Sequence, residues 1–87
     1  MALQFLSYNS SGFNKVKAKF LNELDTVFSL DVILVQEHLH MKENVSIIQT
    51  EFPNFNSFIL PAFKQNMYIS SGKPSGGLCI LWKKILE

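Results

Sequence analysis

Two strand-like segments separated by a helix-like segment constrain the fold of this chain more than any other feature. Residues 3–8 form a short run with aromatic content, and residues 31–35 form an apolar run rich in β-branched side chains, so both predict β-strands. Between them, apolar residues recur at helical spacing over Lys15–Phe28, which predicts an amphipathic helix capped by Asn14. Strands joined by a crossover helix pair in parallel within one sheet. The sequence therefore predicts an α/β fold with a β-α-β start.

The remaining segments extend this sheet. Residues 31–35 show no polar alternation, which is typical of a strand buried on both faces and implies a layer on each side of the sheet. One helix cannot cover both faces. The chain further predicts a short helix around 45–52 that Pro53 ends, strands at 55–60 and 78–82, and a long loop at 61–75 with a brief extended piece at 67–69.

Composition limits the size and class of the molecule. With 87 residues the chain is shorter than the usual domain of about 100 to 150 residues, so it is at most one domain. A hydrophobic content of 47% against 17% charged residues favours a packed core over disorder. The net charge of +1 gives no overall field that would attract nucleic acid or a membrane. Any contact with a polyanion must therefore be local.

The compartment is predicted from the cysteine and from the absence of targeting patterns. The single cysteine, Cys79, lies in an apolar run and is expected to be a buried core residue, which suits a reducing environment. The sequence shows neither the pattern of a signal peptide nor an apolar stretch long enough to span a membrane. We therefore expect a soluble intracellular protein that does not act at a membrane.

Asn9 and Glu37 form the candidate site because each follows one of the two predicted parallel strands. The carboxyl ends of such strands lie at the same edge of the sheet, where α/β proteins place their ligands. Mg²⁺ takes oxygen ligands and only one or two carboxylates in its protein sites. A carboxamide beside a carboxylate at this edge therefore suits a divalent cation and a phosphate. The alternative for Asn9 is a turn former, and for Glu37 a solvated carboxylate.

Three motifs resemble those of the endonuclease/exonuclease/phosphatase family, in the same order and at similar spacing. They are Leu-Ser-Tyr-Asn at 6–9, Leu-Val-Gln-Glu at 34–37, and Gly-Lys-Pro-Ser-Gly-Gly at 72–77 followed by the predicted strand at 78–82. Within the family, Gln-Glu-His-Leu followed by this glycine-containing motif resembles the N-terminal endonuclease of LINE-type non-LTR retrotransposons, which is similar to apurinic/apyrimidinic endonucleases.

This resemblance implies a fold, a cofactor and a substrate. The family folds as a four-layer α/β sandwich of the DNase I type, of which residues 1–87 would be the N-terminal portion. It implies a DNA endonuclease that uses Mg²⁺ or Mn²⁺, with Asn9 and Glu37 in the metal and phosphate site, and action in the nucleus would fit. The family's later motifs, Asp-x-Asn, a further Asp and Asp-His, have no counterpart in these 87 residues. The C-terminal half of the domain is thus expected to be missing, and the chain alone to be inactive.

Two other functions remain open. The chain could be a non-catalytic remnant or interaction module, which the missing motifs favour, or a phosphoesterase of the same family that acts on small phosphoesters, which the glycine-containing motif argues against.

Other polar and aromatic side chains receive structural interpretations. His38 stands where the family often has Thr; it and His40 are interpreted as surface residues because two histidines do not complete a zinc site. Gln36 is expected to donate a structural hydrogen bond, Gly76 and Gly77 to allow close packing, the scattered lysines to be solvated, and Phe13, Phe63 and Tyr68 to pack in the core.

Overall fold

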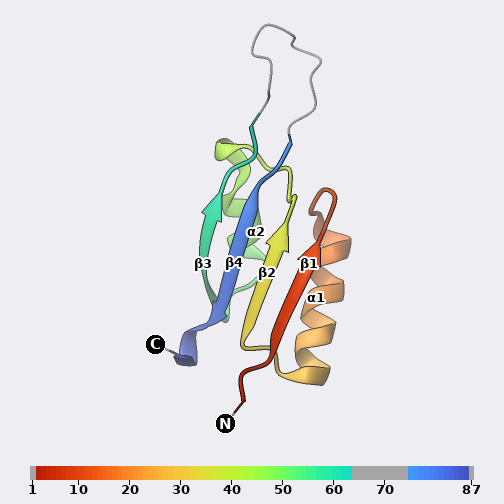
Figure 1. Cartoon of the computed structure of the whole chain (residues 1–87), viewed down its shortest axis with the longest axis vertical. Coiled ribbons are helices and arrows are strands. Elements are labelled where there is room, and N and C mark those ends of the chain that lie inside the picture. The colour runs from red at the N-terminus through yellow and green to blue at the C-terminus, as the bar shows by residue number, and fades with distance from the viewer. Residues whose placement is uncertain (1, 64–74, 87) are drawn as a thin grey trace, which may run out of the picture.

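The chain folds into one mixed sheet with its helices on one side (Figure 1). The structure, a computed structural model, describes residues 2–63 and 75–86. Its elements are β1 (Phe5–Asn9), α1 (Lys15–Phe28), β2 (Val32–Gln36), a 3₁₀ turn (Lys42–Asn44), α2 (Ser46–Thr50), β3 (Phe55–Leu60), β4 (Leu78–Lys83) and a second 3₁₀ turn (Lys84–Leu86). Within the described residues, none of the helices has the length and apolarity needed to cross a bilayer.

The sheet has the order β1-β2-β4-β3. Strands β1 and β2 are parallel, whereas β4 is antiparallel to both β2 and β3. The predicted α/β class and β-α-β start are confirmed, and the four predicted strands are present with shifts of one or two residues at some ends. The extended piece expected at residues 67–69 lies outside the described part of the chain.

Helix α1 has the predicted bounds because both of its ends carry capping interactions. The Asn14 side chain accepts a hydrogen bond from the Lys17 backbone N–H at 2.9 Å, as expected for an N-cap. At the other end Ser29 is left-handed, with φ 52°, and its N–H donates to the Asp25 carbonyl. The Asp25 carboxylate also accepts from the Leu30 N–H at 2.9 Å, which fixes the path from α1 into β2.

The core lies between the sheet and the helices. Alternate residues of the two central strands, Ile33 and Val35 on β2 and Cys79 and Leu81 on β4, are fully buried on the helical side. They pack in one cluster with residues of α1 and α2 and of the loops that flank them: Phe13, Ala18, Leu21, Leu30, Ile48 and Phe52. Both helices thus cover the same face (Figure 1).

The opposite face of the sheet is apolar and only partly shielded, which corrects the expectation that β2 is buried on both faces. Val32, Leu34 and Gln36 of β2 retain intermediate exposure because no layer within the described residues packs over them. The strand register places Leu34 between Ser7 and Ile80, with Phe58 beyond. We call this side the open face; its apolar members are Phe5, Val32, Leu34, Phe58, Leu60, Leu78, Ile80 and Trp82.

Candidate functional site

Asn9 and Glu37 follow the same edge of the sheet. Asn9 is the last residue of β1 and pairs with Gln36, the last residue of β2, so Glu37 comes one residue beyond that pair. The predicted parallel arrangement of their strands is confirmed. In Figure 1 this edge is the upper end of the β1 and β2 arrows. That the two side chains themselves lie close together stays a prediction.

The loop after β1 is hydrogen-bonded along the segment after β2. The backbone N–H of Ser10 donates to the Gln36 carbonyl at 2.9 Å, and that of Gly12 donates to the Glu37 carbonyl at 2.8 Å. The buried Ser10 hydroxyl reinforces this pairing, since it donates to the Gln36 and Glu37 carbonyls at 3.1 and 3.0 Å. The backbones that carry the two candidate side chains are therefore fixed relative to each other.

Lys17 adds a positive charge to this loop. Its ammonium donates to the Ser10 carbonyl and, at 2.7 Å, to the Gly12 carbonyl. Lys17 lies within the predicted helix at 15–28, and the sequence alone gave it no role. The signal that could have identified it is its position at the start of a helix directly after a Ser-Ser-Gly turn, from which a long side chain can reach back to the turn's carbonyls.

Asn9 is exposed and acts as a turn former. Its side-chain oxygen accepts from the Ser11 N–H at 3.2 Å and from the Ser11 hydroxyl at 3.4 Å, the interaction of an Asx turn. Ser11 itself is left-handed, with φ 47°. The turn thereby fixes the orientation of the Asn9 amide.

Glu37 is exposed and has a left-handed backbone, with φ 54°. Among the described residues its carboxylate has no hydrogen-bond or ion-pair partner. A cation would not have to displace a protein partner from this carboxylate.

His38 is a buried residue, so its interpretation as a surface histidine was wrong. Its side chain is 1% exposed, and both ring nitrogens have backbone partners. Nδ1 accepts from the His40 N–H at 2.9 Å, and Nε2 lies 2.9 Å from the Leu60 carbonyl oxygen. Burial lowers the pKa of His38 below its ordinary value. Because Nδ1 accepts a backbone N–H, this nitrogen carries no proton, which agrees with the direction of the pKa change.

His40 is half-buried and also faces the backbone. Its Nε2 lies 2.8 Å from the Phe13 carbonyl oxygen, and its own carbonyl accepts from the Ala62 N–H. Within the described residues, no group of three or more His, Cys, Asp or Glu side chains could hold a metal ion. The hydrogen-bond partners of both imidazole rings are backbone groups of residues 13, 40 and 60.

The remaining polar interpretations have mixed outcomes. Gln36 donates to the Ser7 hydroxyl at 3.0 Å, and Cys79 is buried, which raises the pKa of its thiol to about 12, so both predictions are confirmed. Lys83 pairs with Asp25 at 2.9 Å rather than being simply solvated. Lys64 and Lys73 lie outside the described residues.

Among the aromatic residues, Phe13 is buried as expected, whereas Phe63 is 58% exposed, so its assignment to the core was wrong. Tyr68 lies outside the described residues.

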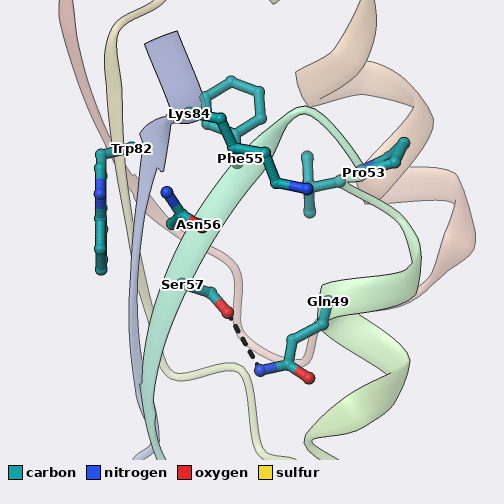
Figure 2. Close-up of a pocket in the computed structure, with 8 residues that line it drawn as sticks. Gln49, Pro53, Phe55, Asn56, Ser57, Trp82 and Lys84 are labelled. Atoms are coloured by element: carbon teal, nitrogen blue, oxygen red, sulfur yellow. Dashed lines mark hydrogen bonds between the residues drawn. The ribbon is translucent and has the colours of Figure 1, made fainter. Parts of the chain in front are cut away.

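An open depression of about 410 Å³ lies at the other end of the sheet. Figure 2 shows Trp82 and Asn56 on adjacent strands there, and the Gln49 amide donating to the Ser57 hydroxyl at 3.1 Å. The strand register separates it from the Asn9 and Glu37 edge by the length of β2. No candidate residue lines this depression.

Comparison with known proteins gives no assignment, since neither the family models nor the curated proteins searched contain a match to the chain.

Proposed function

We propose that this chain provides the metal- and phosphate-binding edge of a Mg²⁺-dependent DNA endonuclease of the endonuclease/exonuclease/phosphatase type, similar to that of LINE-type retrotransposons. The observation that carries the proposal is the parallel β1-α1-β2 unit. Its two strands end at one edge of the sheet in Asn9 and Gln36-Glu37, with the backbones hydrogen-bonded there. Of the third resembling motif, the described residues Ser75, Gly76 and Gly77 precede β4 at this same end of the sheet, where the His38 N–H donates to the Gly77 carbonyl.

The donor set at this edge fits a hard divalent cation. Glu37 offers an exposed carboxylate without a protein partner in the described chain, and Asn9 offers an oriented amide oxygen. One carboxylate with further oxygen donors and water is a usual environment for Mg²⁺ in phosphoryl-transfer sites. Such an ion neutralises charge that develops on the phosphate during hydrolysis. Asn9 would orient the phosphate or the attacking water, and Glu37 would hold the ion.

The open face supports the larger architecture that we propose. A four-layer sandwich requires a second sheet against this side, and eight apolar residues are available there for such packing. In this proposal the groups for acid–base chemistry come from outside these 87 residues.

Plasmid nicking tests the function. The chain alone should not nick supercoiled DNA with Mg²⁺, whereas the chain joined to the C-terminal half of a related retrotransposon endonuclease should. We expect Glu37→Ala to lower the nicking rate of the joined domain by about a hundredfold or more, because a group that stabilises the transition state is lost. Asn9→Ala should also weaken nicking strongly. Glu43→Ala, which removes an exposed carboxylate from the 3₁₀ turn, is the matched control and should leave the rate unchanged.

Nicking that persists with EDTA and in Glu37→Ala would contradict the proposal. The second candidate, a non-catalytic interaction module, is favoured by the absence of the family's Asp-x-Asn and Asp-His motifs from these residues. A joined domain that folds and binds DNA but never nicks it would support this alternative.

A further inference from the structure

The segment after β2 has an unusual backbone. Glu37 and Leu39 are both left-handed, with φ 54° and 64°, although neither is glycine. This conformation is disfavoured for residues that carry a Cβ, and it persists only where surrounding contacts impose it. The contacts that impose it here must therefore lie on the residues around Glu37.

The Glu37 carbonyl accepts from the Gly12 N–H and the Ser10 hydroxyl, and the ring of His38 adds two further contacts. Because Nδ1 accepts the His40 N–H, it carries no proton, so the neutral ring bears its proton on Nε2 and donates it to the Leu60 carbonyl. The first bond closes the turn upon itself, as an Asx-type interaction would. The second ties the turn to the end of β3. Both distances are 2.9 Å, and the ring is almost fully buried.

Gly76 and Gly77 hold the ring from the other side. The backbone N–H of Leu39 donates to the Gly76 carbonyl at 3.2 Å, and that of His38 donates to the Gly77 carbonyl at 3.4 Å. A Cβ on Gly77 would lie only 2.5 Å from Cε1 of His38. The ring therefore occupies a space that only glycine leaves open, between the start of β4 and the end of β3.

We propose that His38 is a positioning residue that holds Glu37 in its left-handed conformation and so directs the carboxylate to the edge it shares with Asn9. The role of the carboxylate rests on the proposed function, but the conformation of Glu37 does not. A purely space-filling role for His38 would require only its volume, whereas the positioning role requires the bond to the His40 N–H.

Nuclear magnetic resonance of the 87-residue chain tests the conformational step. The wild-type ring should give the ¹⁵N pattern of a neutral histidine protonated on Nε2, and Glu37 should show the strong NOE between its own amide and α protons that marks a positive φ. A wild-type ring with its proton on Nδ1, or an extended Glu37, would overturn the inference without any variant.

Two variants then distinguish the effect of the hydrogen bond to the His40 N–H from the effect of the volume of the His38 ring. His38→Leu fills the space but makes neither hydrogen bond, so the strong NOE at Glu37 should be lost. His38→Asn can still accept the His40 N–H through its side-chain oxygen, so it should retain much of the NOE. The amide signals of Ala18 and Leu81, in the core, report whether each variant is folded. A folded His38→Leu with an unchanged NOE would contradict the positioning role. If His38→Leu fails to fold, His38→Asn decides: a folded Asn variant with Glu37 extended overturns the role.

Mn²⁺ provides the functional readout. Added at low concentration, it should broaden the amide signals of Asn9, Ser10 and Glu37. Glu37→Gln should abolish this broadening, Glu43→Gln should not, and His38→Leu should weaken Mn²⁺ affinity about tenfold, as found when groups that orient metal ligands are removed. Absence of broadening in the wild-type chain would overturn the metal role of the edge, while the NOE at Glu37 would still decide the role of His38. Unchanged Mn²⁺ affinity in folded His38→Leu would contradict the claim that His38 supports metal binding by positioning Glu37.

Discussion

At the scale of single residues, Gly77 shows most directly how a distant segment shapes the candidate site. Its φ is 94°, and its Cα faces the ring of His38. Gly76 is a natural comparison because it is also left-handed, with φ 80°, but the nearest atom to a Cβ there would be 3.7 Å away on Phe63. Both glycines have a positive φ that disfavours a residue with a Cβ, but only at Gly77 would a Cβ also clash with a neighbouring side chain.

We expect Gly77→Ala to lower the free energy of unfolding by about 3 kcal/mol. About 1 to 2 kcal/mol comes from the left-handed backbone, and a similar amount comes from forcing a methyl group against the His38 ring. Gly76→Ala should cost only the backbone part, about 1 to 2 kcal/mol. Denaturant unfolding of both variants measures the difference. Equal losses would mean that the ring moves aside without cost.

The sequence could not have predicted the burial of His38. Residues 38 and 40 were assigned to the surface because two histidines do not complete a zinc site, and the sequence gives no sign of the left-handed backbone at Glu37 that precedes the buried ring. The buried position of the ring depends on Gly77, which comes 39 positions after His38, and on the carbonyl of Leu60. The placement of Asn9 and Glu37 at one edge of the sheet, by contrast, was predicted from the local order of strand, helix and strand, because the ends of parallel strands share an edge; their role as a site stays a prediction.

At the scale of elements, helix α1 was the most predictable part of the fold. Its apolar spacing repeats over four turns, and its caps are local to the sequence. Strand β2 was located correctly, but the prediction that both of its faces are buried was wrong. A continuous apolar run shows that a strand is suited to burial, but it does not show which other elements cover it. Phe63 was misplaced for the same reason, because aromatic composition alone does not say which rings find neighbours.

The N-cap of α1 gives the prediction at this scale. Asn14→Ala should reduce the free energy of unfolding by about 1 kcal/mol, because the Lys17 N–H loses its only side-chain acceptor in the described structure. Asn14→Asp should retain the cap and most of the stability. Thermal unfolding followed by circular dichroism compares the two variants. A loss as large in Asn14→Asp as in Asn14→Ala would show that the cap is not the cause.

At the scale of the whole molecule, the sheet has two unlike faces. The helical face is packed, whereas the open face leaves Phe58 57% exposed and Phe5 67% exposed. Contiguous apolar surface of this kind is seldom left to solvent, because water contact costs about 25 cal/mol per Å². The 87 residues taken alone are therefore expected to associate through this side.

We expect the isolated chain to show concentration-dependent self-association, which Phe58→Lys should reduce. The charge would lie midway along β3, an edge strand of the open face, and resist burial of this face against another apolar surface. Val16→Lys is the control, because Val16 is 78% exposed on α1, away from this face. Sedimentation velocity over a range of concentrations measures the effect. A wild-type chain that stays monomeric at high concentration would refute the expectation.

The order of the strands also determines when the chain can complete its fold during synthesis. Strand β4 lies between β2 and β3, although it follows both along the chain. Because a ribosome releases the N-terminal part first, β1, α1 and β2 emerge long before the strand that joins them to β3. Until Lys83 has left the exit tunnel, β3 has no neighbour in this sheet and β2 is paired on one side only. The nascent chain thus carries unpaired edges on β2 and β3 until β4 has emerged, and this sheet can be completed only then.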